Sequence, residues 1–314
     1  MQHAMSQSKS IQRDGSIFQQ KIIPCLWFDH QAEEAANFYT SIFKNSGITK
    51  VTRYLKATET VSGKPAGSVM TVEFQLDGYE VIALNGGPQY SFSPAISFVK
   101  NCETKEETDA VWEKLCQGGM VLMELGAYPF SEKFGWVQDR FGVSWQVNYG
   151  PGRQTVAPCL LFNAQQSGKA QEAIEFYTSL FKDSEILKME RYGINDTGAE
   201  GAIKHALFSL NGQKFSAMDS NLEHAFTFTP AVSLHVNCET QDEVDRLWER
   251  FTQGGEAEAC GWLKDRYGVS WQIVPAILNQ LLNDSNSEQA ERVVKAMLEM
   301  VKLDIRTLKQ AYAQ

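Results

Sequence analysis

Short apolar runs and one amphipathic helix pattern follow each other in a fixed order along this chain. Residues 21–29 (KIIPCLWFD) form an apolar run that is too short for a helix, which predicts a strand. Residues 31–43 then place apolar side chains at i, i+3 and i+4, the spacing of an amphipathic helix. Three strand-like segments follow at 48–55, 68–76 and 80–84. The predicted order is therefore one strand, one helix and three strands.

The same order occurs again between residues 95 and 149, and the whole series is repeated from residue 156. The densest match is GWVQDRFGVSWQV at 135–147, which returns as GWLKDRYGVSWQI at 261–273 with nine of thirteen positions identical. The first copy has a longer loop, AYPFSEKF at 127–134, that the second lacks. Such agreement indicates a duplicated structural unit, with insertions confined to loops.

The repeat divides the chain into four parts. Residues 1–20 are polar and without periodicity, which predicts a flexible N-terminal tail. Residues 21–150 and 151–275 are the two copies. Residues 276–314 form a C-terminal tail with two predicted helices, at 287–300 and 303–313, that have no counterpart after the first copy. We expect these helices to pack across the two halves or onto a partner.

Composition places the chain among ordinary globular proteins and narrows the range of partners. Hydrophobic residues make up 43% and charged residues 21%, and the formal net charge is −9. A net negative charge argues against nucleic acid or an anionic membrane as partner, since both require clustered Lys and Arg. The six cysteines form no CxxC pair and are expected to be buried thiols. The chain also lacks a signal peptide pattern and a long apolar run, so we expect a cytoplasmic protein.

The repeated blocks resemble the vicinal oxygen chelate superfamily, which includes glyoxalases, bleomycin-resistance proteins and extradiol dioxygenases. Within it, IPCLWFD, ANFYTSIFKNS and GWVQDRFGVSWQV are similar to the PhnB-like group, often labelled 3-demethylubiquinone-9 3-methyltransferase domains. The resemblance covers about residues 21–275 and the tail. It implies an α+β fold of two tandem domains, each with two βαβββ modules whose mixed sheet curls into an eight-stranded cup. It also implies a pseudo-dimer within one chain, since single-copy members dimerise.

Strand alternation selects the side chains that should face these cups, because successive residues of a strand point to opposite faces. In the strand at 143–148 the apolar face holds Trp145 and Val147, so Gln146 and Asn148 are expected to face the cup. Trp136 and Trp262 either stack on a flat ligand or pack in the core beside a structural Asp-Arg pair, and we favour packing. The candidate ligand-binding residues are Trp27, Thr71, Glu73, Asn85, Trp136, Gln146, Asn148, His205, Asp219, His235, Trp262 and Gln272.

A metal site is not predicted, although a divalent ion is an open alternative. Metal enzymes of the superfamily take ligands from first strands and a Glu from a last strand. The last-strand position here is occupied by Gln146 and Gln272, and the first strands begin with Ile22 and Val156. Two glutamines without a histidine do not match a firm divalent site. Methyl transfer is also unsupported, because no GxGxxG turn leads from a first strand into a helix.

We therefore expect a PhnB-like protein that binds a small organic ligand, with no cofactor and an unassigned reaction. The alternatives are a metal-dependent lyase, isomerase or dioxygenase of this superfamily or, by the family label alone, a demethylubiquinone methyltransferase. If only one cup is functional, the second is favoured because both His205 and His235 belong to the second copy. The C-terminal helices are a candidate surface for homodimerisation.

Overall fold

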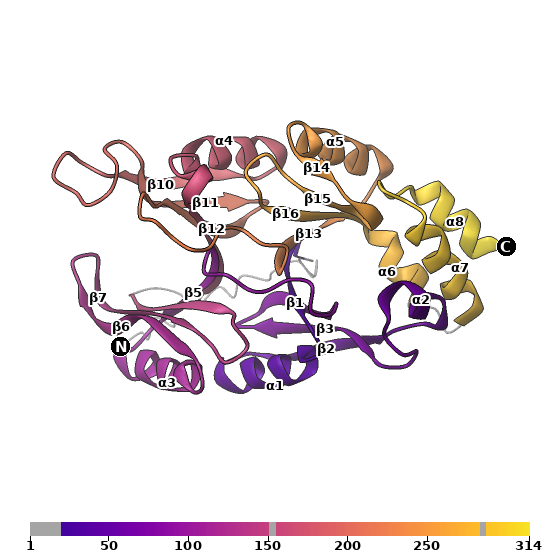
Figure 1. Ribbon diagram of the computed structural model, residues 1–314, viewed down its shortest axis with the longest axis horizontal. Helices are drawn as coiled ribbons and strands as arrows, with labels where there is room; N and C mark the ends of the chain where they lie inside the picture. Colours follow the sequence, from indigo (N-terminus) through magenta and orange to yellow (C-terminus); the bar gives the residue numbers. More distant parts are fainter. Residues whose placement is uncertain (1–19, 151–154, 283–286) are drawn as a thin grey trace, which may run out of the picture.

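The computed structural model describes residues 20–150, 155–282 and 287–314. The predicted flexible tail at residues 1–20 lies outside the described residues, except for Gln20. The predicted series of strand, helix and three strands occurs four times, and we call these units modules 1 to 4. Modules 1 and 2 form the first repeat and modules 3 and 4 the second (Figure 1).

The elements of the first repeat are β1 (Ile22–Phe28), α1 (Ala32–Ile42), β2 (Gly47–Arg53), η1 (Lys56–Thr58), α2 (Glu59–Ser62), β3 (Val69–Leu76) and β4 (Tyr79–Asn85) in module 1, and β5 (Ile96–Cys102), α3 (Lys105–Cys116), β6 (Met120–Tyr128), β7 (Ser131–Gln138) and β8 (Ser144–Tyr149) in module 2. Those of the second repeat are β9 (Thr155–Phe162), η2 (Ala164–Gln166), α4 (Ala170–Leu180), β10 (Glu185–Arg191), β11 (Ile203–Leu210) and β12 (Gln213–Asp219) in module 3, and β13 (Val232–Cys238), α5 (Gln241–Thr252), β14 (Glu256–Ala257), η3 (Ala259–Gly261), β15 (Trp262–Lys264) and β16 (Ser270–Pro275) in module 4. The tail contains α6 (Ala276–Leu282), α7 (Ser287–Leu298) and α8 (Ile305–Ala313).

Two eight-stranded mixed sheets form, as the fold class predicts, but each sheet takes one module from each repeat. Sheet A has the order β14-β15-β16-β13-β1-β4-β3-β2 and joins modules 1 and 4. Sheet B has the order β10-β11-β12-β9-β5-β8-β7-β6 and joins modules 2 and 3. The junctions are antiparallel, β1 with β13 and β5 with β9. The expectation that the two modules of one repeat form one eight-stranded cup is therefore wrong.

The two modules of a repeat are held together by their helices and not by a shared sheet. Helices α1 and α3 lie together on one side of the molecule, and α4 and α5 lie on the opposite side (Figure 1). Tyr39 Oη on α1 of module 1 donates to Asp139 Oδ2 in module 2 at 2.7 Å. Tyr177 and Asp265 make the same bond in the second repeat, also at 2.7 Å. The strand edges of β1 and β5 are left to pair with the other repeat, β1 with β13 and β5 with β9.

The aspartate that both copies of the GWxxDRxGVSWQ block share makes this buried contact. Asp139 also accepts from Trp145 Nε1 at 2.9 Å and from the backbone N–H groups of Phe141 and Val143. Asp265 repeats these bonds with Trp271, Tyr267 and Val269. The expectation that the Asp-Arg pair is structural is thus confirmed for both aspartates, which hold the turn before the last strand. Each aspartate fixes a turn, a strand and a helix at once.

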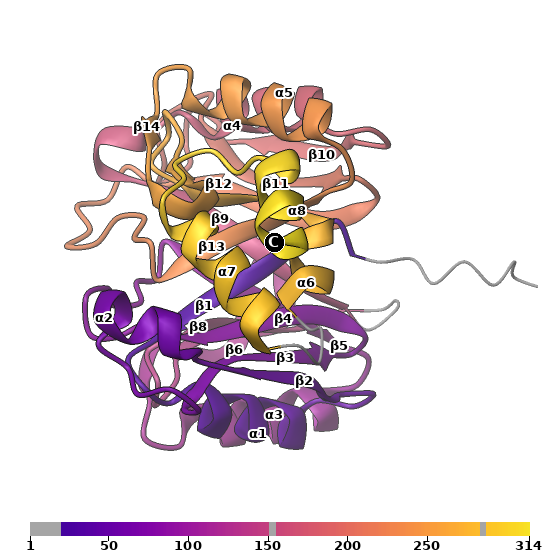
Figure 2. The ribbon, with the colours of Figure 1, turned by 90° about the vertical axis from the view of Figure 1, so that its right-hand side faces the viewer.

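The C-terminal helices pack across modules 1 and 4, which belong to different repeats. This agrees with the expectation that the tail packs across the two halves of the chain. Helix α7 contacts η1 of module 1 and η3 of module 4, so it bridges the two modules (Figure 2). The backbone N–H groups of Cys260 and Gly261 donate to the carbonyls of Met300 and Val301, each at 2.8 Å. The predicted helices at 287–300 and 303–313 are confirmed as α7 and α8, whereas α6 was not predicted. Within the described residues, no helix has the length and apolar character that crossing a membrane requires.

Candidate functional site

The face of each sheet that is turned away from the helices carries ten of the twelve candidate residues, and we call these faces cup A (sheet A) and cup B (sheet B). Strand register aligns residues across each cup in rows. One row of cup A runs through Trp262, Gln272, His235 and Ile23. The equivalent row of cup B runs through Trp136, Gln146, Val99 and Ala157. The two cups are therefore built from equivalent positions of the two repeats.

The structure divides the predicted site residues between three places. Cup A contains Trp27, Thr71, Glu73, His235, Trp262 and Gln272. Cup B contains Trp136, Gln146, Asn148 and His205. Asn85 and Asp219 lie on the helix side of their sheets. The expectation that one cup holds both His205 and His235 is therefore wrong, because modules 3 and 4 belong to different sheets.

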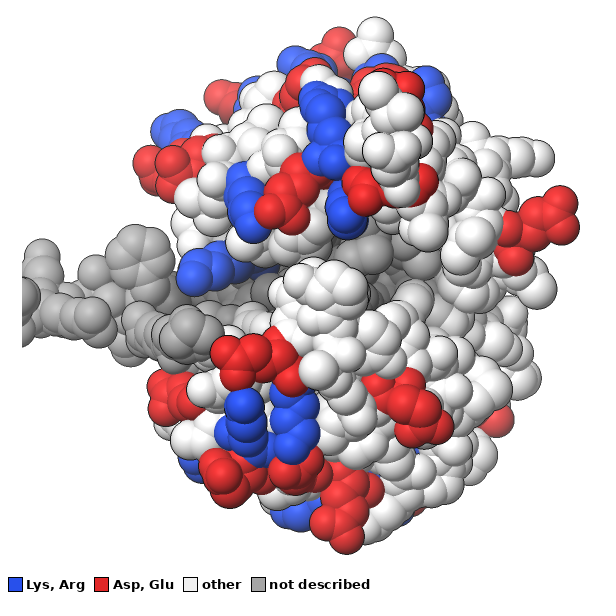
Figure 3. All heavy atoms as spheres, turned by 90° about the vertical axis from the view of Figure 1, so that its left-hand side faces the viewer, with Lys and Arg blue, Asp and Glu red and all other residues white. Residues whose placement is uncertain are grey.

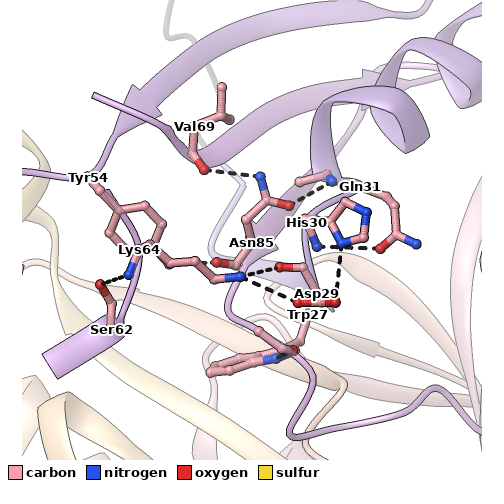
Figure 4. A network of polar contacts seen from close by, with 11 residues as sticks. Trp27, Asp29, His30, Gln31, Tyr54, Ser62, Lys64, Val69 and Asn85 are labelled. Carbon is pink, nitrogen blue, oxygen red and sulfur yellow. Dashed lines mark hydrogen bonds and ion pairs between the residues drawn. The ribbon is translucent and has the colours of Figure 1, made fainter. Parts of the chain in front are cut away.

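Asn85 and Asp219 bind the N-terminal ends of α1 and α4 and do not face a cup. Asn85 Oδ1 accepts from the backbone N–H of Ala32, the first residue of α1, at 2.8 Å, and Asn85 Nδ2 donates to Val69 O at 3.0 Å. Figure 4 shows the Asn85 side chain directed toward the start of α1 and away from Trp27. Asp219 Oδ1 likewise accepts from the N–H of Ala170 at 3.1 Å. The predicted direction of these two side chains is wrong.

The floor of each cup carries the same small polar cluster of a glutamine, a serine and a cysteine. In cup A, Gln272 Nε2 donates to Ser233 Oγ at 2.9 Å, and Cys25 lies beside both side chains. In cup B, Gln146 Nε2 donates to Ser97 Oγ at 2.8 Å, beside Cys159. Burial raises the pKa of Cys25 to about 11 and also raises the pKa of Cys159, so both remain thiols at neutral pH.

Above this floor, cup A is closed by two tryptophans from different repeats. The rings of Trp27 and Trp262 meet edge to face with their centroids 5.8 Å apart, and Tyr90 lies against Trp27 at 5.0 Å. Trp27 Nε1 donates to Gly87 O at 2.8 Å. A Cβ at Gly86 would lie only 2.1 Å from the Trp27 ring, so the ring fits because residue 86 is a glycine. His235 beneath is 8% exposed.

Cup B lacks this closure because its residues differ at the same positions. Leu161 aligns with Trp27, and Ser220 aligns with Gly86. Trp136 Nε1 donates to Ser144 Oγ at 2.7 Å, and among the described residues no aromatic ring contacts the Trp136 ring. Trp136, Met218 and His205 are each half-buried, and Leu207 is 37% exposed. Trp27 and Trp262 of cup A are half-buried as well, so the difference between the cups is the second indole that lies against Trp262 and is missing beside Trp136.

Comparisons with known proteins agree with the repeat and the fold. The family model described as 3-demethylubiquinone-9 3-methyltransferase matches the chain twice, at residues 20–148 and 154–274. The chain belongs to this family. The PhnB protein of Bacillus cereus is 44% identical over 42% of this chain and 100% of its own, with a TM-score of 0.38. A comparison with curated proteins finds no match.

Glyoxalase I from Zea mays is similar in fold to this 3-demethylubiquinone-9 3-methyltransferase family protein over most of the chain. It covers 80% of this chain and 90% of its own at 10% identity, with a TM-score of 0.53. At that identity the likeness concerns the fold alone. The protein PA1353 of Pseudomonas aeruginosa is 24% identical over 43% of this chain and 100% of its own, with a TM-score of 0.36.

The residues of this family member do not fit a resident divalent ion in either cup. Among the described residues, no three or more His, Cys, Asp or Glu side chains cluster closely enough to hold a metal. His235 Nε2 lies 3.1 Å from Asn237 Oδ1, and Gln272 already donates to Ser233. His205 has Glu190 opposite it on β10, and Glu190 pairs with Lys188 at 2.6 Å. Burial lowers the pKa of both histidines, so each is neutral at pH 7.

Two features of the site were missed by reasoning from the sequence. The first is the glutamine–serine–cysteine floor, whose members lie on three separate strands. The second is the contrast between Trp27 with Gly86 and Leu161 with Ser220, which decides whether a second indole lies in the cup. The alignment of the two copies already shows this difference, because Trp27 of the first copy aligns with Leu161 of the second in otherwise similar strands.

Proposed function

We propose that this protein binds a small, planar, largely uncharged organic molecule in cup B. The observation that supports this most is that, among the described residues, no aromatic ring contacts the half-buried Trp136 ring, because Leu161 stands where cup A has a second indole. A flat ligand gains most by stacking on such a face, since aromatic pairs add about 0.5–1.5 kcal/mol beyond their buried area. Leu207 and Met218 supply apolar surface from module 3.

Among the polar groups of cup B, His205 fits recognition of one ligand oxygen, because the Asn148 amide is already held by two neighbours. Asn148 Oδ1 accepts from Ser131 Oγ at 2.6 Å, and Asn148 Nδ2 donates to Asn101 Oδ1 at 2.9 Å. His205 is neutral at pH 7 and can donate or accept a hydrogen bond. An apolar pocket with a few fixed polar groups is typical of small-molecule sites.

The charges near cup B argue for a ligand with little net charge. Lys188 and Glu190, on the edge strand β10, neutralise each other. The side of the molecule that carries sheet B shows Lys and Arg grouped with Asp and Glu, and neither sign forms a large patch (Figure 3). Among the described residues, a strongly charged ligand would find no group of opposite charges on this side of the molecule to attract it.

The chemistry named by the family receives less support than binding does. Both sheets are mixed, and the connection from β1 to α1 runs through Asp29, His30 and Gln31 without a glycine. A nucleotide-type cofactor needs a Gly-rich turn where the backbone can approach it. The thiol of Cys159 has no base beside it in its cluster of Gln146, Ser97 and Ser216. Binding without a covalent step is therefore the function we propose.

Isothermal titration with 2-naphthol, a flat ring with one oxygen, tests the proposal. Trp136→Ala should weaken binding at least tenfold, the equivalent of about 1.4 kcal/mol, and the double variant Leu161→Trp/Ser220→Gly should abolish it by filling cup B as Trp27 fills cup A. Val61→Trp adds an indole on the exposed helix α2 and serves as the matched control. Equal affinity in wild type and in both cup variants would refute the proposal.

A further inference from the structure

The two cups use the same tryptophan position in two different ways. Trp136 and Trp262 occupy the same register, opposite Gln146 and Gln272 respectively. Trp136 donates its indole N–H to Ser144. The aligned serine in cup A is Ser270, which is 2% exposed and whose Oγ finds no hydrogen-bond partner among the described residues. Trp262 instead lies against Trp27.

A buried hydroxyl without a partner is costly, and the other cup shows which group satisfies it. The Trp262 ring therefore has two competing partners: the Trp27 ring and the Ser270 hydroxyl. Trp27 is fixed, because its N–H bonds to Gly87 O and its ring fills the space left by Gly86. Trp262 is the member of the pair that can move.

The backbone before Trp262 is also unlike its counterpart in cup B. Cys260 and Gly261 both have left-handed backbone, with φ of 59° and 83°. The aligned residues, Phe134 and Gly135, lie inside the regular strand β7. The carbonyls of Met300 and Val301 accept from the N–H groups of Cys260 and Gly261. The C-terminal tail thus holds the two residues that set the direction of Trp262.

We propose that Trp262 is a gate over a second binding site in cup A, shut against Trp27 and opened when its indole N–H bonds to Ser270. Opening would uncover the floor formed by Gln272, His235 and Ser233. This floor offers an amide, a neutral imidazole and a hydroxyl beneath an aromatic wall. The site would take a planar aromatic molecule with a hydroxyl or carbonyl oxygen, and this ligand class rests on the function proposed for cup B.

The gate itself is tested without any ligand, by indole N–H exchange in ¹⁵N-labelled full-length protein. The Trp262 signal is assigned by its loss in Trp262→Phe, and Trp136 is the internal reference for the bonded state. Trp27→Leu, which copies cup B, should slow Trp262 exchange at least tenfold, and adding Ser270→Ala should reverse this. Trp27→Phe repeats the measurement with a smaller change if Trp27→Leu does not fold. An exchange rate that is the same in wild type, both Trp27 variants and the Ser270→Ala double variant overturns the gate.

The binding site is tested by titrating 2-naphthol into the same proteins. Trp27→Leu should bind one more molecule per chain than wild type, and it should keep one when Leu161→Trp/Ser220→Gly fills cup B. If cup B does not bind, wild type takes none and Trp27→Leu takes one, which still supports the site in cup A. A Trp27→Leu protein that binds no molecule once Leu161→Trp/Ser220→Gly fills cup B refutes the second site.

Discussion

A buried ion pair joins the two modules of the first repeat, and the second repeat replaces it with uncharged residues. Lys100 on β5 of module 2 is 0% exposed, and its Nζ bonds to Asp77 Oδ2 in the β3–β4 turn of module 1. Glu107 Oε1 lies 3.8 Å from the same ammonium group. In the second repeat Val236 aligns with Lys100, and Asn211 aligns with Asp77. The second repeat therefore shows which uncharged residues can take the place of this ion pair.

Removing the lysine alone should cost far more than removing both charges. Lys100→Val leaves the Asp77 carboxylate, whose side chain is 4% exposed, without its counter-ion. Loss of one partner from a buried pair costs about 3–5 kcal/mol, whereas an apolar replacement of the whole pair is often neutral or stabilising. We expect a loss of about 3–5 kcal/mol for Lys100→Val and about 1 kcal/mol for Asp77→Asn/Lys100→Val, which copies the second repeat.

Urea unfolding followed by far-ultraviolet circular dichroism measures both losses. The control is Lys44→Val, which removes the exposed partner of Glu107 at 3.8 Å and should change stability by less than about 1 kcal/mol. If the single and double variants lose the same stability, the ion pair contributes nothing specific, and the reasoning from buried charge is wrong.

Three further predictions concern the repeated structural contacts. Burial raises the pKa of Asp139 to about 6, so its protonated form stabilises the fold fully below about pH 4, and this contribution is lost as the pH rises through 6. Asp139→Asn should therefore reduce the fall of the melting temperature between pH 4 and 7 without removing it, because burial also raises the pKa of Asp265, and an unchanged slope would contradict this. Thr104 caps α3 by accepting from the Glu107 N–H, so Thr104→Ala should cost about 1 kcal/mol in urea unfolding, unlike Thr197→Ala in the exposed β10–β11 connection. A Cβ at Gly119 would lie 2.4 Å from Gln138 O, so Gly119→Ala should cost about 1–3 kcal/mol in the same assay, whereas the open Gly126→Ala should not.

The sequence predicts the modules well because their signals are local. The order of strands and helices, the two copies and the helices α7 and α8 all follow from apolar spacing and repeated blocks. The pairing of β1 with β13 does not, since every module presents the same open strand edge and nothing local selects its partner. The contacts that go with this pairing are distant in the sequence: β1 meets β13 more than 200 residues later, and within the first repeat Tyr39 bonds to Asp139, 100 positions along the chain.

Side-chain direction was correctly predicted where one face of a strand is clearly polar. In β8, Gln146 alternates with Trp145 and Val147, so the pattern has one solution. In β4 both faces are apolar, with Val81 and Ala83 on one side and Ile82 and Leu84 on the other, and the pattern cannot distinguish them. The alternation therefore does not predict the side of Asn85, which binds the start of α1.

A tandem copy also changes what the two cups can become. In a pair of identical chains that exchanged modules in this way, both cups would have the same residues, so filling one with Trp27 would fill the other. Here Trp27 and Gly86 sit in one repeat, and Leu161 and Ser220 in the other, so each cup has its own closure. The tail adds to this difference, because it holds Cys260 and Gly261 beside cup A, whereas cup B has the longer β6–β7 hairpin in the same place. Exchanging the four residues between the repeats should therefore exchange the accessibility of Trp136 and Trp262 to acrylamide, and a protein in which both tryptophans keep their original accessibility would show that the tail alone decides which cup is closed.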